Sequence, residues 1–293
     1  MTTACTAACA ADPTPTVPPA LALRRWWRLT VALAGAGLVS LRAPLAGAVG
    51  RRRMVVSTAA RLLTAAGVRV EVHASPVAWP PTGWGRGPGH LVVSNWVSWV
   101  DELALLTVVP GVPVADREIW GRPARRAHGV LLDRARPRTL PGTVDQVGAL
   151  LDTGTSVTVR PEGTTSCGAG LGRFRPAFFQ AAVDTAAPVC PVAVRYRVDG
   201  GAATAVAASP AGESRRRSVA RVVAARGLVV EVHLLPALDP VGADRRELAA
   251  LAEYAIAAVT EARPPVAAAH PRRLPLQEAV AAVRGQDRTR ESL

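Results

Sequence analysis

Two apolar segments of this chain break into polar, turn-forming residues at the point where an expected strand ends. Residues 91–93 read Leu-Val-Val and run into Ser-Asn-Trp-Val-Ser-Trp-Val-Asp, and residues 157–159 read Val-Thr-Val and run into Arg-Pro-Glu-Gly-Thr. Parallel α/β sheets have continuous apolar strands, and their reactive groups follow the carboxyl ends of those strands. The two segments therefore predict an α/β fold in which both polar stretches share one end of a sheet.

Apolar runs of strand length alternate with segments of helical periodicity along most of the chain. The expected strands are residues 68–72, 90–94, 112–114, 129–132, 155–159, 189–194, 202–207 and 228–234. The expected helices are residues 101–109, 118–127, 140–151, 174–185, 215–226 and 244–262, with a short one near 276–284. This alternation predicts one α/β domain over residues 55–262, a mixed, mostly parallel sheet flanked by helices.

The ends of the chain differ in composition from this domain. Residues 1–20 are rich in Ala, Thr and Pro, which predicts a disordered tail, and residues 264–293 form a second tail rich in Pro and Arg. In residues 24–53, arginines and tryptophans flank the apolar run 29–41, which is shorter than the ~20 residues of a bilayer span. We expect an N-terminal hydrophobic helix that associates with a membrane surface, with packing on the protein's own core as the alternative.

The charge of the chain restricts its partners. The formal net charge is +13, and all 35 basic residues are arginine. Anionic lipid headgroups and phosphorylated substrates fit this charge, whereas two Tyr and three Phe with no aromatic–basic interleaving argue against nucleic acid. The four cysteines show neither metal-ligand spacing nor disulfide density, so we expect no metal site and a reducing, cytoplasmic setting.

Several short motifs follow one another in the middle of the chain. They are Asn-Trp-Val-Ser-Trp-Val-Asp at 95–101, Gly-Val-Leu-Leu-Asp-Arg at 129–134, Pro-Glu-Gly-Thr at 161–164, Phe-Arg at 174–175 with Phe179, and Val-Cys-Pro-Val-Ala-Val-Arg-Tyr at 189–196. In this order they resemble the glycerolipid acyltransferase family, that of 1-acyl-glycerol-3-phosphate acyltransferase. The sequence of residues 162–180 is most similar to the lyso-ornithine lipid acyltransferase branch.

The resemblance implies a fold, a reaction and partners. It implies a glycerolipid-acyltransferase-like domain that moves an acyl group to a lysolipid hydroxyl from acyl-CoA or acyl carrier protein, with no cofactor or metal beyond this co-substrate. The acyl donor, the lysolipid acceptor and an anionic membrane surface would be its partners, on the cytoplasmic face of the cell membrane as a peripheral or monotopic protein.

The resemblance also implies roles for particular residues. Position 96 is that of the catalytic base, and Asp101 is its carboxylate partner. The substrate-binding positions are Asn95, Ser98, Arg134, Glu162, Gly163, Thr164 and Arg175, with Arg134 on the phosphate of the acceptor. Read without the family, Asp101 is also a favourable charge in the first turn of a helix, and Arg134 is one of several surface arginines.

The chain departs from the family pattern at the base position, which holds Trp96 in place of histidine. Histidine suits this role because its pKa lies near neutrality, whereas indole is a donor only. His90 and His128 are the neighbouring histidines that could substitute as base, although the ~15–18 Å of extended chain between His90 and Asn95 argues against His90. Arg160 replaces the usual aromatic residue before Pro161. Two alternatives remain: an acyltransferase, or a family member that binds lysolipid or acyl donor without turnover.

Overall fold

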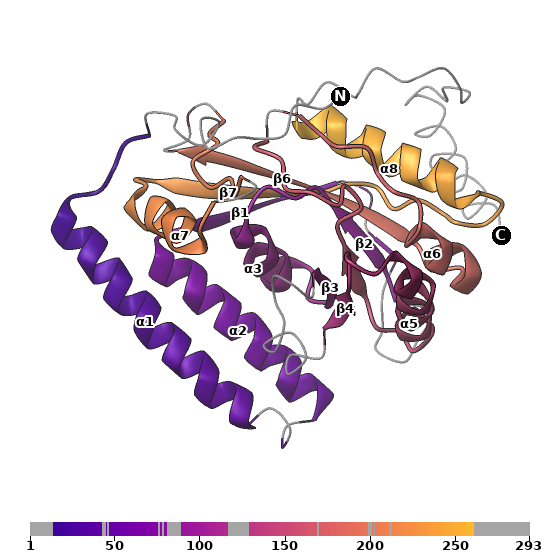
Figure 1. Ribbon diagram of the computed structural model, residues 1–293, viewed down its shortest axis with the longest axis horizontal. Helices are drawn as coiled ribbons and strands as arrows, with labels where there is room; N and C mark the ends of the chain where they lie inside the picture. The colour runs from indigo at the N-terminus through magenta and orange to yellow at the C-terminus, as the bar shows by residue number, and fades with distance from the viewer. Residues whose placement is uncertain are drawn as a thin grey trace.

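A seven-stranded sheet with helices on both faces forms the body of the molecule (Figure 1). The computed structural model describes residues 14–42, 45, 47–75, 77, 79–80, 89–116, 129–168, 170–198, 201, 203–210 and 213–260. The strands are β1 (Arg69–Ala74), β2 (Leu91–Ser94), β3 (Val112–Asp116), β4 (Val130–Leu132), β5 (Val157–Val159), β6 (Val189–Val198) and β7 (Leu228–Leu234). Their order is β1-β7-β6-β2-β5-β3-β4, and every neighbouring pair is parallel except β6 and β7. The predicted α/β class and mostly parallel sheet are confirmed.

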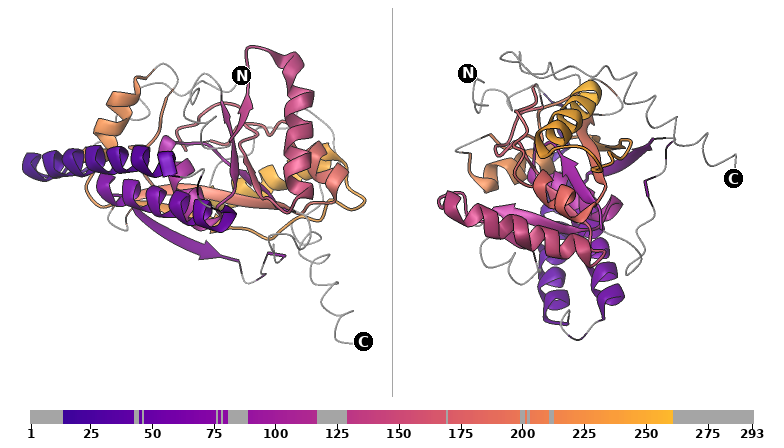
Figure 2. Two further views of the ribbon diagram at one scale, coloured as in Figure 1. Left: turned by 90° about the horizontal axis from the view of Figure 1, so that it is seen from below. Right: turned by 90° about the vertical axis from the view of Figure 1, so that its right-hand side faces the viewer.

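Helices cover the sheet in two layers, which the views of Figure 2 separate. The helices are α1 (Pro19–Arg42), α2 (Ala48–Ala66), α3 (Trp99–Val108), the short 3₁₀ helix η3 (Pro137–Thr139), α5 (Leu140–Asp152), α6 (Phe179–Thr185), α7 (Arg215–Ala224) and α8 (Arg245–Thr260). Strand β2 is buried on both faces: Leu91 and Val93 pack with α5, α6 and α8, while Val92 packs with α2, α3 and α7. Burial on both faces explains why its sequence is a continuous apolar run.

Two expected elements differ from those observed. The helix expected from residue 174 begins at Phe179, because Pro176 interrupts the segment and the backbone N–H of Phe174 donates to Glu253 at 2.7 Å instead. The strand expected at 202–207 is irregular: Ala203 makes an isolated bridge to Arg197, and Val206 and Ala207 lie in a turn. The helix expected at 118–127, residue His128 and the tail 264–293 lie outside the described residues.

The N-terminal segment packs on the domain as a hairpin of α1 and α2 (Figure 1). The Val17 N–H donates to the carbonyl of Ala224 at 2.8 Å, and the Val17 side chain is buried, so residues 14–18 are attached to the domain where a disordered tail was predicted. The boundary expected between residues 53 and 55 falls inside α2. Among the described helices, none combines the length and the apolar character that crossing a bilayer would take.

Arg25 on α1 connects the α1–α2 hairpin to the last turn of α7 through hydrogen bonds. Its guanidinium donates to the carbonyl oxygens of Val223 at 2.9 Å and Ala225 at 2.7 Å. A cation at this end also complements the helix dipole. Arg25, which the sequence suggested as a lipid-facing arginine, therefore serves an internal contact.

Candidate active site

The segment between β2 and α3 is anchored by its own polar side chains. Asn95 is 2% exposed, and its amide pairs with the backbone of Val194 in β6, accepting from the N–H at 2.8 Å and donating to the carbonyl at 3.0 Å. Ser98 is buried and caps α3 by accepting from the N–H of Val100 at 3.3 Å. Both predicted substrate-binding residues are therefore engaged in holding this segment.

Asp101 lies fully buried in the first turn of α3. Its Oδ2 accepts from the backbone N–H groups of Val97 at 2.7 Å and Ser98 at 2.8 Å, and its Oδ1 accepts from the hydroxyl of Tyr196. Burial raises the pKa of Asp101, and these hydrogen bonds oppose the rise. The carboxylate completes a capping box with Ser98 and fixes how the chain enters the helix.

Trp96 is half-buried beside a charged pair that sequence reasoning missed. The Cζ atom of Arg160 lies 5.3 Å from the centre of the Trp96 ring, and the Arg160 guanidinium donates to the carboxylate of Glu102. Arg160 and Glu102 are 9% and 8% exposed. Burial lowers the pKa of Arg160, and the charge of Asp101 opposes this. The available signals were a second acidic residue beside Asp101 and an arginine where the family has an aromatic residue.

Glu162 follows β5 and connects two loops of the site. Its Oε1 accepts from the N–H of Trp96 at 2.8 Å, and its Oε2 accepts from the N–H of Gly172, also at 2.8 Å. The residue is 5% exposed. Burial raises the pKa of Glu162 to about 7, with the backbone hydrogen bonds opposing and the charges of Asp101 and Glu253 adding to the rise. A carboxyl group near its titration midpoint at neutral pH therefore touches the residue at the base position.

Two arginines converge over Gly163, next to Glu162. Gly163 has φ +77°, and a Cβ placed there would lie 3.1 Å from Nη1 of Arg134 and 3.3 Å from Nε of Arg175. The positive φ favours glycine, and a Cβ there would press against the two guanidinium groups. Thr164 follows and is exposed. We call Arg134, Arg175 and Gly163 the arginine cluster.

The structure thus brings one group of expected site residues together and places another group beneath it. Glu162, Gly163, Arg134 and Arg175 lie together, and Trp96 joins them through its hydrogen bond to Glu162. Asn95, Ser98 and Asp101 are buried and hydrogen-bonded within the protein. The chemical roles assigned to all of these residues remain predictions.

His90 stands apart from this site. It precedes β2, at the opposite end of the strand from Trp96, and its Nε2 lies 2.8 Å from the carbonyl oxygen of Pro80. Burial lowers the pKa of His90. This position excludes His90 as a substitute for the missing catalytic base beside Trp96 and Glu162.

Comparisons with known proteins identify the family of the chain. The family model described as Acyltransferase matches residues 69–195. The chain is 33% identical over 230 residues to a 1-acyl-sn-glycerol-3-phosphate acyltransferase of Neisseria gonorrhoeae, covering 76% of this chain and 87% of the relative. It is 30% identical over 241 residues to a lyso-ornithine lipid O-acyltransferase of Pseudomonas aeruginosa, covering 80% of this chain and 86% of the relative.

A solved structure shares the fold. The crystal structure of the 1-acyl-sn-glycerophosphate acyltransferase PlsC from Thermotoga maritima superposes with a TM-score of 0.60 at 22% identity. The match covers 83% of this chain and 94% of that chain. At this identity the likeness concerns the fold.

Proposed function

We propose that this chain transfers an acyl group to the hydroxyl of a phosphorylated lysolipid. The chain belongs to the family of glycerolipid and lysophospholipid acyltransferases. Family membership makes it an O-acyltransferase of lipid biosynthesis, with an acyl donor and a lysolipid acceptor as substrates. None of the matched relatives supports the alternative of a binding protein without turnover. The observation that carries the acceptor assignment is the arginine cluster beside Glu162.

The arginine cluster supports an anionic acceptor headgroup. Arg134 and Arg175 both approach Gly163, so two permanent positive charges face one small space. A guanidinium binds phosphate through two parallel hydrogen bonds, which fixes orientation as well as charge. We therefore assign the phosphate of a 1-acyl-glycerol-3-phosphate type acceptor to this cluster, with lyso-ornithine lipid as the second candidate acceptor.

Glu162 is our candidate for the group that receives the proton. The acceptor hydroxyl oxygen attacks the thioester carbonyl, a C–O bond forms and the C–S bond breaks, and the released thiolate takes up the proton that Glu162 has accepted. A base acts best when its pKa lies near the working pH, and the pKa of Glu162 is about 7. The indole of Trp96 has no basic lone pair, whereas Glu162, which accepts from the backbone N–H of residue 96, is a titratable group at this position.

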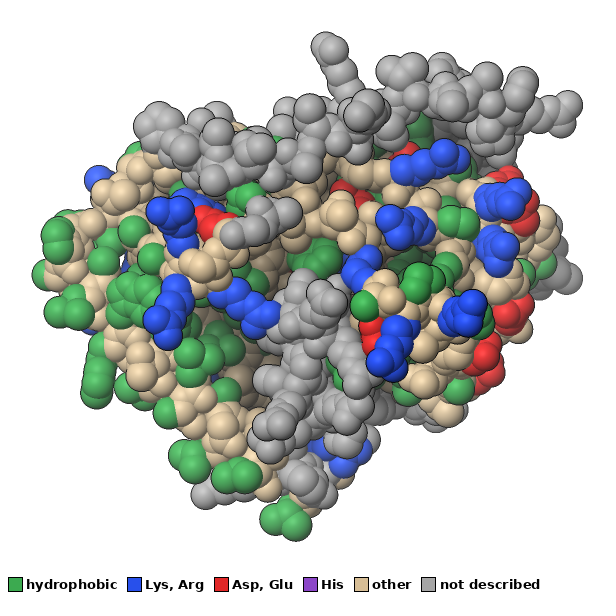
Figure 3. Space-filling view, viewed as in Figure 1, with side chains coloured by type: hydrophobic (Ala, Val, Ile, Leu, Met, Phe, Trp, Pro, Cys, Tyr) green, Lys and Arg blue, Asp and Glu red, His purple; other side chains and the backbone are tan. Residues whose placement is uncertain are grey.

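The exposed face of α1 supports docking on a lipid surface. Leu23, Trp27, Val31 and Leu38 recur at helical spacing and are 72%, 69%, 53% and 61% exposed. Figure 3 shows hydrophobic side chains along this edge of the molecule. With a net charge of +13, an anionic leaflet is the matching partner. We propose peripheral or monotopic attachment at the cytoplasmic face of the membrane.

The test is an acyl-transfer assay with the purified full chain. Acyl-CoA and acyl carrier protein thioesters are each paired with 1-acyl-glycerol-3-phosphate or lyso-ornithine lipid, without added cofactor. We expect turnover of the phosphorylated acceptor, and Arg134→Gln should raise its KM by about 10–100-fold, one to three kcal/mol of lost contact. Arg138→Gln, at an exposed arginine of η3, is the matched control. Lysolipid binding with no transfer from any donor would overturn the proposal.

A further inference from the structure

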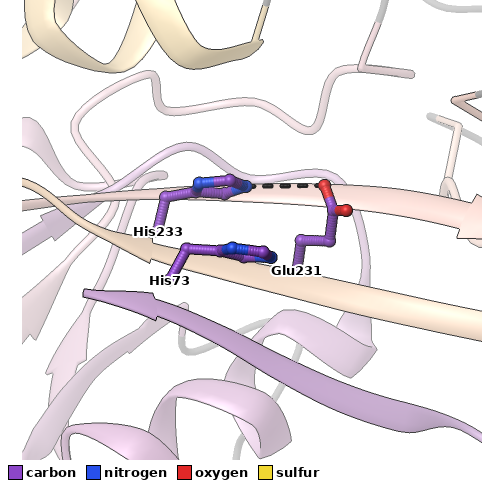
Figure 4. A group of neighbouring side chains, drawn as sticks. All are labelled: His73, Glu231 and His233. Atoms are coloured by element: carbon purple, nitrogen blue, oxygen red, sulfur yellow. Dashed lines mark hydrogen bonds and ion pairs between the residues drawn. The ribbon is translucent and has the colours of Figure 1, made fainter. Parts of the chain in front are cut away.

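Two histidines and a glutamate meet on the edge of the sheet, away from the site described above (Figure 4). His73 lies on the edge strand β1, and Glu231 and His233 lie on β7. The parallel register places His73 directly opposite His233. Glu231 is two residues before His233, so their side chains point to the same face of the sheet.

The three side chains present their ligand atoms to one another. The imidazole rings are stacked with centroids 4.4 Å apart and planes 12° apart. One ligand atom from each residue lies within 4.8 Å of the others, and His233 Nε2 is 3.4 Å from Glu231 Oε2. Donors of a tetrahedral ion with bonds of about 2.0–2.1 Å lie about 3.3–3.5 Å apart, so the two rings must tilt out of their stack for their lone pairs to converge on one ion with Glu231.

The two carboxylate oxygens of Glu231 face different partners. Its Oε1 pairs with Nε of Arg197 at 3.0 Å, while its Oε2 is the atom that faces His233. This ion pair engages one oxygen of the carboxylate and leaves the other directed at His233. Arg195 lies 4.0 Å from Oε2, and its Nη1 donates to the carbonyl of Val259 in α8. The nearby positive charge reduces the attraction for a cation, so we expect weaker binding than in a closed four-ligand site.

The three residues differ in how far they are exposed to solvent. His73 is exposed, Glu231 is buried and His233 is intermediate. An ion therefore enters from solvent on the side of His73 and meets the buried carboxylate of Glu231 on the inner side.

We propose that His73, Glu231 and His233 bind one divalent transition-metal ion, with Zn²⁺ the preferred ion and a water molecule at the remaining position. Two imidazoles and one carboxylate are a donor set suited to Zn²⁺, Co²⁺ and Ni²⁺, whereas Mg²⁺ and Ca²⁺ prefer oxygen ligands. Because one ligand comes from β1 and two from β7, the ion joins the edge strand to its neighbour.

The site lies on the other face of the sheet from Asp101 and Tyr196. His233 is paired with Ala193 and Glu231 with Arg195, and these positions of β6 alternate with Val194 and Tyr196. Ala193 packs in the cluster that includes α8, whereas Tyr196 packs in the cluster that includes α3. The ion would therefore lie apart from Asp101 and Tyr196, and its expected effect is to stabilise the sheet edge.

Titration of the metal-free full chain, carrying no affinity tag, with Zn²⁺ and with Mg²⁺ tests the proposal. Calorimetry should give one Zn²⁺ per chain and no Mg²⁺ binding. Thermal unfolding should show a rise in Tm of about 5–10 °C at about a hundredfold excess of Zn²⁺ over its Kd. His73→Asn and His233→Asn should each abolish both effects.

The controls separate this site from other zinc-binding groups. His270→Asn removes a histidine from elsewhere in the chain and should leave the Zn²⁺ stoichiometry and the Tm shift unchanged. His73 is exposed, so the metal-free His73→Asn variant should melt as the metal-free parent does, which shows that its fold is intact. No Zn²⁺ binding by the parent, or a Tm shift that persists in both histidine variants, would overturn the assignment.

Discussion

The guanidinium carbon of Arg160 lies 5.3 Å from the centre of the Trp96 ring, within the range of a cation–π contact. These are two of the positions at which the chain departs from the family pattern, since an aromatic residue stands at the base position and an arginine stands where an aromatic residue is usual. The indole of Trp96 and the guanidinium of Arg160 contact each other. Glu102 holds Arg160 in this arrangement through its buried ion pair.

The absence of a basic side chain at position 96 predicts that the Trp96→His variant is more active than the parent. In Trp96→His, the imidazole would have Asp101 nearby, whose carboxylate offers about four acceptor positions and accepts three protein hydrogen bonds. We expect kcat to rise by about 10²-fold or more, the usual contribution of a general base. Trp96→Ala removes the ring without adding a base and is the control. Equal gains in the two variants would show that ring bulk, and not basicity, limits the parent rate.

The pH dependence of turnover should report on Glu162. Because the pKa of Glu162 is about 7, we expect kcat/KM to rise with pH through about 7 as the carboxyl group ionises. Glu162→Gln should lose this limb and at least about 10²-fold in kcat/KM. Glu253→Gln changes a neighbouring carboxylate and should keep the limb. A profile that is unchanged in Glu162→Gln would assign the titration to another group.

The same group should make the free energy of unfolding depend on pH. Between pH 4.5 and about 7 the folded chain retains a proton that the unfolded chain releases, so stability from this group falls as pH rises through that window. Denaturant titrations of the parent and of Glu162→Gln at pH 5 and pH 8, values chosen as roughly the two ends of the window, measure the difference. A smaller loss between the two pH values in Glu162→Gln is the expected result.

The hydrogen bonds of Asp101 predict that this residue stabilises the fold, whatever part it takes in catalysis. Asp101→Asn retains an oxygen for the N–H groups of Val97 and Ser98, so we expect a loss of about 1 kcal/mol in the free energy of unfolding. Asp101→Ala leaves these donors and the Tyr196 hydroxyl without their acceptor in a buried site, so we expect about 3–5 kcal/mol. Chemical denaturation compares the two. Near-parent kcat in Asp101→Asn would assign Asp101 to support of the fold.

The apolar face of α1 predicts how the protein binds lipid. A triple variant with Leu23, Trp27 and Val31 changed to Gln should bind liposomes of anionic lipid at least about 10-fold less, because each side chain loses more than 1 kcal/mol of apolar transfer. Binding by the parent should also weaken as salt rises. Changing the exposed Val241 and Tyr254 to Gln is the control. Unchanged binding by the triple variant would place the lipid contact elsewhere.

The sequence by itself determined the class of fold and the order of the motifs. A strand buried on both faces is largely apolar, so β2 and the first six residues of β6 are visible in the chain as short continuous runs. Polar residues after β2 and β5 had to meet at one end of the sheet, because those strands are adjacent and parallel. The sequence thus predicted that Glu162 and residue 96 share one end of the sheet, and the pairing of β2 with β5 brings them into contact.

Only the tertiary structure decided what each polar group contacts. Tyr196 reaches Asp101 across 95 positions, and Glu102 pairs with Arg160 across 58, so no local pattern contains either contact. The metal-ligand set has the same origin, since the parallel pairing of β1 with β7 brings His73 beside His233 although 160 positions separate them. Local spacing determines which residues share a strand or a helix face, but strand order and register determine which of them become neighbours, and these follow from packing of the whole sheet.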